Sequence, residues 1–367
     1  MQHKDPKGVP NKSRDTGYID RFNREIRDAF RDALQESFKS PALALFFART
    51  ALTQRRAARK RLAREKQGIH VPPLLIASVT GKCNLNCKGC YAQSQRWAKV
   101  KELPIPRWQE IIREAHELGV SVVMIAGGEP LTRPEILDVT RRFPEIIFPL
   151  FTNGLLLDDR LVKELRRQRH VLPVISLEGF ELETDERRGL GVYDRARRAI
   201  ARLAGSDIFF GVSLTITRRN FALLTGPRFF KTLHDAGARI FIYVEYTPIQ
   251  EGTEDLVLTR EQKAGLEARK LKLRAQYGGV VIGFPGDEEQ YGGCLAAGRG
   301  FIHVGPDGSL EPCPFAPYSD TNLRKSTLKE ALKSELLRKI RDNHGRLSET
   351  RGGCALWENR EWVRSLL

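Results

Sequence analysis

Residues 82–91 decide the fold, and they read Lys-Cys-Asn-Leu-Asn-Cys-Lys-Gly-Cys-Tyr. Cys83, Cys87 and Cys90 are separated by three and then two residues, so one short loop can bring three thiolates together. Thiolates are the usual protein ligands of iron–sulfur clusters. The apolar run 74–79 precedes the loop and predicts a buried strand. The loop would then lie at a strand's carboxyl end, where α/β folds build their active sites.

A four-iron cluster needs one ligand more than this loop supplies, so its fourth iron would be open to a ligand that is not protein. A zinc site is a competing interpretation, but zinc takes a fourth Cys or His close by, and the next histidine is His116. Three unrelated buried cysteines are the remaining interpretation, which the polar Asn, Lys and Gly residues of the loop disfavour. The spacing therefore favours an iron–sulfur loop.

The composition is that of a globular protein of two domains, or of one barrel with attachments. The chain has 367 residues, of which 41% are hydrophobic, and no apolar run approaches the length of a membrane-spanning helix. The polar first forty residues do not resemble a secretory signal. The six cysteines fall in clustered motifs rather than in a small disulfide scaffold, which predicts a reducing cytoplasm.

Positive charge is concentrated near the N-terminus. The net charge is +16, and residues 1–70 hold 17 Lys and Arg against 8 Asp and Glu. Such a surface suits nucleic acid, anionic lipid or an acidic substrate, whereas a solvated arginine-rich helix is the plainer interpretation. Residues 1–16 are polar and are predicted to be disordered.

Two helices are predicted before the first strand. Apolar residues recur every three or four positions over 19–38. The second helix begins at Pro41, after a capping Ser40, and is nearly all apolar to Leu52 before it becomes cationic. Residues 49–66 would either lie in water beside an apolar half packed on the fold, or bind an anionic membrane or nucleic acid. The short apolar half favours packing on the fold.

From residue 74 to residue 245, apolar strands alternate with amphipathic helices, which predicts an α/β fold with a parallel sheet. The predicted strands are 74–79, 120–126, 147–151, 172–177, 209–216 and 240–245. The predicted helices are 108–118, 134–143, 159–168, 193–204 and 229–236.

The cysteine loop and Gly127-Gly128-Glu129-Pro130, which follows the second predicted strand, together resemble the radical S-adenosylmethionine (SAM) superfamily. The resemblance implies a partial (βα)6 barrel and a [4Fe–4S] cluster whose open iron is chelated by SAM. It also implies reductive cleavage of SAM to a 5′-deoxyadenosyl radical, which abstracts hydrogen from a substrate. Cys83, Cys87 and Cys90 would then form the catalytic centre.

The resemblance also assigns SAM contacts to the strand ends. Ser176 and Glu178 alternate at the end of the fourth strand and so share one face, where the family holds the ribose hydroxyls. Many members carry an aromatic residue just before the third cysteine, whereas this chain has Gly89. Adenine stacking is therefore expected from elsewhere, and Glu245 and Tyr246 are candidates for adenine or substrate contact. The implied SAM-binding residues are Gly127, Gly128, Glu129, Asn153, Ser176, Glu178 and Thr215.

The C-terminal part predicts a helix over 259–275, a strand over 280–284, a hairpin and a helix over 327–342. The hairpin joins a strand over 301–304 to residues 310–313 through Pro306-Asp307-Gly308. It resembles the hairpin that opens SPASM and twitch domains, which are the auxiliary-cluster extensions of radical SAM enzymes. Three cysteines would bind the auxiliary cluster, with the fourth position open to substrate or filled by a residue such as His303 or His344: Cys294, Cys313 and Cys354.

Three functions are compatible with this sequence. The favoured one is a radical SAM oxidoreductase acting on a peptide, a protein or a small metabolite, with SAM and a reducing partner such as flavodoxin or ferredoxin. The others are a radical enzyme that modifies lipid or nucleic acid, docked through residues 49–66, and a non-catalytic electron carrier. We expect a cytoplasmic protein, peripheral at the membrane in the docked case. The expected domains are residues 1–70, 71–250 and 251–367.

Overall fold

The computed structural model describes residues 24, 27–29, 31–33, 35, 41–95, 99–284, 291–347 and 354–367. The predicted disorder over 1–16 and most of the predicted helix over 19–38 lie outside these residues. The described residues between 24 and 35 are helical.

One sheet of nine strands runs through the molecule in the order β7-β6-β5-β4-β3-β2-β1-β8-β9. Every neighbouring pair is parallel except β8 and β9. The predicted α/β fold with a partial barrel of parallel strands is confirmed. The strands predicted over 280–284 and 301–304 are β7 and β8, and they join the same sheet. The strands are Leu74–Ser78, Val122–Ala126, Phe148–Thr152, Val171–Leu177, Gly211–Ile216, Ile240–Glu245, Val280–Phe284, Phe301–Val304 and Leu310–Glu311.

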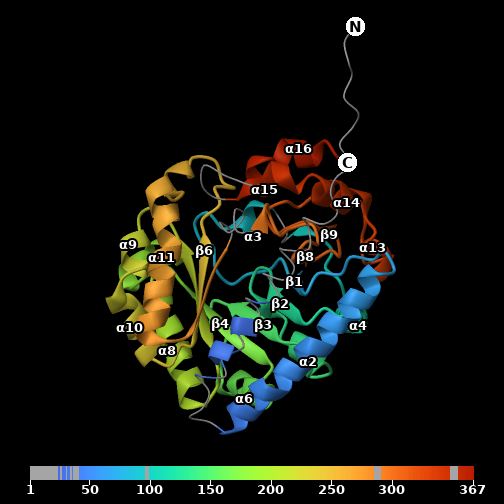
Figure 1. The fold of residues 1–367 in the computed structure, drawn as a ribbon. Coiled ribbons are helices and arrows are strands. Elements are labelled where there is room, and N and C mark those ends of the chain that lie inside the picture. Colours follow the sequence, from blue (N-terminus) through green and yellow to red (C-terminus); the bar gives the residue numbers. More distant parts are fainter. Residues whose placement is uncertain are drawn as a thin grey trace.

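Figure 1 shows the sheet curled, with α8, α10 and α11 on its outer side and α2 running diagonally in front of it. The large apolar core lies between the outer helices and the sheet. The helices are α2 (Pro41–Glu65), α3 (Tyr91–Ser94), α4 (Ile105–Leu118), α5 (Ile136–Thr140), α6 (Asp159–Arg167), α7 (Glu181–Arg188), α8 (Val192–Gly205), α9 (Phe221–Leu224), α10 (Pro227–Asp235), α11 (Arg260–Tyr277), α13 (Leu328–Ala331), α14 (Glu335–Asp342), α15 (Ala355–Glu358) and α16 (Arg360–Arg364).

The sheet is buried on both faces, as parallel sheets are. Along β6, Phe241 belongs to the large core, whereas Ile240 and Ile242 belong to a second apolar cluster on the opposite face. Leu43 and Phe47 of α2 are part of that second cluster. The apolar half of α2 therefore packs on the barrel, as the favoured interpretation predicted. In the described part of the chain, no helix combines the length and hydrophobicity needed to cross a membrane.

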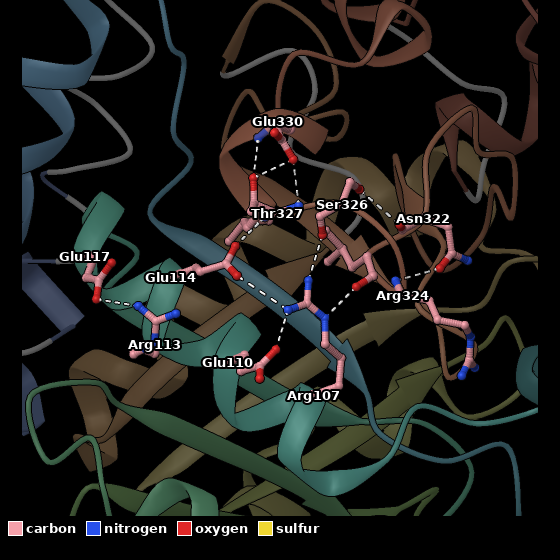
Figure 2. Close-up of polar contacts among 12 residues, drawn as sticks. Arg107, Glu110, Arg113, Glu114, Glu117, Asn322, Arg324, Ser326, Thr327 and Glu330 are labelled. Atoms are coloured by element: carbon pink, nitrogen blue, oxygen red, sulfur yellow. Dashed lines mark hydrogen bonds and ion pairs between the residues drawn. The ribbon is translucent and has the colours of Figure 1, made fainter.

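The C-terminal extension is fixed to α4 by a polar network centred on Arg107 (Figure 2). The Arg107 guanidinium donates to the carbonyl oxygens of Leu323 at 2.6 Å and Ser326 at 2.7 Å. Its Nη1 atom also lies 2.6 Å from a carboxylate oxygen of Glu110. One half-buried side chain on the barrel thus satisfies two carbonyls of the extension, which orients the segment before α13.

One predicted helix is wrong in its extent. The helix expected over 327–342 is two helices, α13 and α14, because the chain breaks before Ser334. Ser334 caps α14 by accepting from the backbone N–H of Leu337, and its hydroxyl donates to Asp320 at 2.6 Å. Asp320 also accepts from the N–H of Leu336 at 2.9 Å. A distant carboxylate therefore stabilises a second helix start that the periodicity does not reveal.

Candidate active site at the carboxyl ends of the strands

Two glycines after β2 hold the base of the cysteine loop. The N–H of Gly128 donates to the carbonyl of Thr80 at 2.8 Å, and the N–H of Glu129 donates to the carbonyl of Lys82 at 2.8 Å. A Cβ atom at Gly127 would lie 2.3 Å from the Thr80 oxygen, and one at Gly128 would lie 2.1 Å from the Lys82 oxygen. Only glycine therefore permits this close approach of two backbones.

Glu129 joins the ends of β2 and β3. Its Oε1 atom accepts from the Thr152 hydroxyl at 2.7 Å and from the Leu131 N–H at 3.0 Å, while Oε2 accepts from the Asn153 N–H at 2.7 Å. Burial raises the pKa of Glu129, and these hydrogen bonds oppose that increase. Both carboxylate oxygens thus bind protein donors, and one of these donors, Asn153, also contacts the cysteine loop.

Asn153 connects the third strand to the cysteine loop itself. Its side-chain amide donates to Oδ1 of Asn84 at 2.8 Å, and its own Oδ1 accepts from the Leu155 N–H at 2.9 Å. On the other side of the loop, Glu102 accepts from the Thr80 hydroxyl at 2.7 Å and from the Gly81 N–H at 2.9 Å. The loop is therefore held from both sides before any ligand binds.

The three loop thiols lie close enough to affect one another. Cys83 is exposed, and Cys87 and Cys90 are half-buried. Partial burial of the Cys83 sulfur raises its pKa to about 11, and the charges of Glu129, Cys87 and Cys90 add to the increase. The N–H of Leu85 points at the Cys83 sulfur at 3.4 Å, as expected beside a thiolate ligand. This donor set of neighbouring, accessible thiols fits an iron–sulfur cluster.

Glu178, at the end of β4, forms ion pairs with two arginines of α7. Its Oε1 atom lies 2.5 Å from Arg187 and 2.6 Å from Arg188. Arg187 also donates to the Thr215 hydroxyl at 3.0 Å and to the Lys88 carbonyl at 3.1 Å. The structure thus brings the predicted residues Glu178 and Thr215 together through an arginine that also contacts the cysteine loop. Ser176 lies half-buried on the same strand.

Unpartnered polar atoms lie at the end of β4 and just after β6. Glu178 is 1% exposed, and its Oε2 atom has no hydrogen-bond partner among the described residues. The same holds, over the same residues, for the hydroxyls of Tyr246 and Thr247 at the end of β6. Leaving buried polar groups unpaired costs about 1–3 kcal/mol each. Their gathering at the strand ends beside the cysteine loop indicates a site for a polar ligand.

Tyr246 covers the residue before the third cysteine. Gly89 has a φ of +66°, and a Cβ atom there would lie 2.3 Å from the Tyr246 hydroxyl. The Arg187 guanidinium lies 5.9 Å from the centre of the Tyr246 ring, and the Gly89 N–H donates to Gln250 at 3.2 Å. The Tyr246 side chain therefore fills the space that a side chain at residue 89 would occupy. This contact cannot be recognised from the sequence alone.

Helix α7 is the longest of the described helices that the sequence did not predict, and it carries Arg187 and Arg188. It has eight residues, and Thr184 is the only buried one, so it carries no apolar periodicity. The available signal was its charge order, with Glu181 and Glu183 in the first turn and Arg187 and Arg188 in the last. That order complements the helix dipole and marks a short helix.

The C-terminal thiols form a second, enclosed set. Cys294, Cys313 and Cys354 are 8%, 5% and 2% exposed. Burial raises the pKa of Cys313, and a hydrogen bond to Cys354 and the charge of Cys294 reinforce the shift. The predicted hairpin is confirmed, since β8 and β9 are antiparallel with His303 opposite Glu311. The fold therefore brings together three thiols that are far apart in the sequence.

His303 is not free to act as a fourth ligand. One ring nitrogen lies 2.8 Å from the Ser78 hydroxyl and the other lies 2.7 Å from Glu311. His344 differs, because among the described residues only its Nδ1 atom has a hydrogen-bond partner, the Arg341 carbonyl at 2.7 Å. Of the two histidine candidates, the geometry leaves His344.

Neither thiol set is shaped for a single ion. Over the described ranges, no group of three or more Cys, His, Asp or Glu side chains could hold one metal ion.

Residues 77–220 match the family model of the Radical SAM superfamily. An AdoMet-dependent heme synthase of Methanosarcina barkeri is 28% identical over 79% of this chain and 89% of its own length. The mycofactocin maturase MftC of Mycobacterium tuberculosis is 29% identical over 79% and 80%. The PqqA peptide cyclase of Gluconobacter oxydans is 27% identical over 67% and 71%.

The fold is similar to that of SuiB from Streptococcus suis, crystallised with S-adenosylmethionine. The TM-score is 0.64 at 19% sequence identity, over 81% of this chain and 74% of SuiB. SuiB crystallised with its precursor peptide SuiA superposes with a TM-score of 0.63, also at 19% identity, over 81% and 75%.

Proposed function

The chain belongs to the radical SAM superfamily, and we propose that it cleaves SAM reductively at a [4Fe–4S] cluster held by Cys83, Cys87 and Cys90. When bound, such a cluster supplies one electron to the SAM sulfonium, which yields methionine and a 5′-deoxyadenosyl radical that takes a hydrogen atom from the substrate. A flavodoxin or ferredoxin would supply the electron. The observation that carries the proposal is the held loop of three accessible thiols beside unpartnered strand-end groups.

Arg187 and Arg188 would hold the anionic part of SAM. Both guanidiniums lie at the Glu178 carboxylate, and their charges oppose the effect of burial that raises the pKa of Cys87. They therefore lie within electrostatic reach of the cluster loop. Guanidinium groups bind carboxylates through paired hydrogen bonds. The free Oε2 atom of Glu178 would accept from a ribose hydroxyl.

Tyr246 would supply the ring that residue 89 lacks. Its side chain is buried against Gly89 at the third cysteine, and an aromatic ring there can stack on a purine. Its unpaired hydroxyl can bond a ring nitrogen or a ribose oxygen. The missing aromatic residue of the loop would thus be replaced from the end of β6.

Formation of 5′-deoxyadenosine tests the main proposal. Anaerobically reconstituted protein, reduced with dithionite and given SAM, should release 5′-deoxyadenosine and methionine, and Cys87→Ala should not. A carrier protein would bind iron without cleaving SAM. Undiminished product from Cys87→Ala, or none from the unaltered protein, would contradict the proposal.

The substrate is proposed to be a peptide, a protein or a small metabolite. Two of the relatives are named as a peptide cyclase and a heme synthase. SuiB, which has a similar fold, was crystallised with a precursor peptide. With SAM turnover established, addition of a candidate substrate should transfer its hydrogen to 5′-deoxyadenosine. Deuterium in the product from a labelled candidate identifies the site of abstraction.

We also propose an auxiliary iron–sulfur cluster at Cys294, Cys313 and Cys354, in an extension that begins near residue 251. The convergence of three buried thiols supports it. Reconstituted protein should hold about eight irons, and Cys294→Ala about four. If His344 is the fourth ligand, His344→Ala should change the electron paramagnetic resonance signal of the auxiliary cluster without loss of iron from the loop. An unchanged signal would leave that position to substrate.

A further inference from the structure

The outer face of α2 carries an alternating apolar and basic strip. Leu45, Arg49, Leu52, Arg56 and Arg59 are separated by four, three, four and three residues, so they share one side of the helix. All five are exposed, with Leu45 at 52% and Leu52 at 54%. We call these five residues the outer strip. Large exposed leucines within a cationic row are unusual on a helix that faces only water.

The charges of the outer strip are not balanced. Between Pro41 and Arg64 the helix contains no acidic residue. By contrast, Arg338 on α14 pairs with Glu335 at 2.5 Å and with Asp342 at 2.7 Å. Across the part of the chain that the structure describes, no carboxylate pairs with Arg49, Arg56 or Arg59. Helix α14 thus carries carboxylates that pair with its exposed arginine, whereas the described carboxylates leave the three arginines of the outer strip without an ion pair.

The inner face of α2 is fixed, so the outer strip cannot turn inward. The rings of Phe47 and Phe209 meet edge to face at 4.9 Å between centroids. The Gln54 amide donates to the Ser121 carbonyl at 3.2 Å, and the Arg61 guanidinium donates to the Gly119 carbonyl at 2.7 Å. Burial lowers the pKa of Arg61 to about 10. The barrel therefore presents the outer strip as a rigid surface.

We propose that the outer strip docks the protein on an anionic lipid bilayer. Arginines at the headgroup level attract phosphate, while exposed leucines between them enter the boundary with the acyl chains. A single-stranded nucleic acid is the weaker match, because it is bound by stacking on aromatic rings. The aromatic residues of this helix, Phe46 and Phe47, lie in the apolar cluster instead. This proposal is independent of the cluster chemistry, so either can fail alone.

Vesicle binding by the full-length protein tests the docking surface. We expect co-sedimentation with mixed phosphatidylcholine–phosphatidylglycerol vesicles, little with phosphatidylcholine alone, and weakening with added salt. The double substitution Arg56→Glu and Arg59→Glu should lower the partition coefficient about a hundredfold or more. Leu52→Asp should lower it about tenfold, because one apolar side chain no longer enters the bilayer.

The chain offers matched controls. Arg195 and Arg197 are exposed arginines on α8, and reversing both makes the same change in net charge away from α2. Leu271 is a helical leucine on α11 that is 53% exposed, so Leu271→Asp matches Leu52→Asp. Both controls should bind vesicles as the unaltered protein does. Thermal unfolding of all four variants should show that they are folded.

Three results would overturn the proposal. The first is a loss of vesicle binding in the α8 control equal to that of the Arg56 and Arg59 double variant, which would show that binding depends only on net charge. The second is unchanged vesicle binding by Leu52→Asp in 0.15 M salt, where the Debye length is about 8 Å and charge attraction is screened. That result would exclude insertion of Leu52 into the bilayer. The third is absence of vesicle binding, including the case in which the protein binds single-stranded RNA instead.

Discussion

The two sets of three cysteines differ in how the fold builds them. The loop thiols come from eight consecutive residues and are partly exposed, whereas Cys294, Cys313 and Cys354 come from three separate segments and are buried. A site that must admit SAM has to remain open, while a site enclosed by the protein can hold a cluster away from water. The difference suggests that the loop carries the reaction and that the C-terminal set supports it.

Aromatic residues that neighbour the two sets in the sequence are in contact. The rings of Tyr91, next to Cys90, and Phe315, two residues after Cys313, meet edge to face at 5.3 Å between centroids. Burial raises the pKa of Tyr91, and the charges of Cys90 and Cys313 add to the increase. This residue therefore lies between the sets, so the separation of their roles has to be tested with variants that leave the other set intact.

The largest expected effect separates the two sets by their ligands. Cys90→Ala should lower the rate of 5′-deoxyadenosine formation by more than about a hundredfold. Changing a residue that only supports a metal ligand can already lower activity about a hundredfold, and this variant removes a ligand itself. Cys313→Ala should leave SAM cleavage within a few-fold of the unaltered rate. The measurement is the rate of product formation under dithionite, per mole of protein. Equal losses in both variants would show that the open and enclosed sites act as one.

The second prediction concerns Gly128, which contacts the base of the cysteine loop, and uses a glycine at the end of α8 as its control. Gly128→Ala should destabilise the protein by about 1–3 kcal/mol, because its Cβ atom would meet the Lys82 carbonyl at 2.1 Å. Gly205→Ala, where nothing lies within 4 Å of the new atom, should be neutral or stabilising by up to about 1 kcal/mol. Urea unfolding of the cluster-free protein measures both. A stable Gly128→Ala variant would mean that the loop is not held as described.

Sequence reasoning worked where one local signal fixes the structure. Apolar runs located the six barrel strands, and a spacing of three and two residues located the loop. It did not find α7, because Arg187 and Arg188 lie on a short helix that buries almost nothing. The break before Ser334 and the contact of Tyr246 with Gly89 depend on residues far away in the chain. These are tertiary contacts, and no local pattern encodes them.

The third prediction moves an aromatic ring from residue 246, after β6, to residue 89 in the cysteine loop. Tyr246→Ala should weaken SAM binding about tenfold, since a stacked ring is lost. Gly89→Phe alone should also weaken binding, because its side chain would meet Tyr246. The double variant Gly89→Phe, Tyr246→Gly should recover part of the affinity by placing a ring on the loop, because the clash is removed while the strain of a phenylalanine at a φ of +66° remains. Equilibrium dialysis of SAM against reconstituted protein measures this, and a double variant no better than either single one would remove Tyr246 from the SAM site.

The smallest expected effect compares how the two sites lose iron. Cys87→Ala leaves only the enclosed set able to bind a cluster, and Cys313→Ala leaves only the open one. Because a chelator reaches exposed sulfurs first, the cluster of Cys313→Ala should lose iron several times faster than that of Cys87→Ala, measured anaerobically by the decay of visible absorbance.

Burial of Cys294 and Cys354 at 8% and 2% exposure allows iron loss from the enclosed cluster only through local opening. Added urea below the unfolding transition should therefore speed iron loss from the enclosed cluster more than from the open one. Equal rates would mean that enclosure does not protect the C-terminal cluster and that the two sites differ only in their ligands.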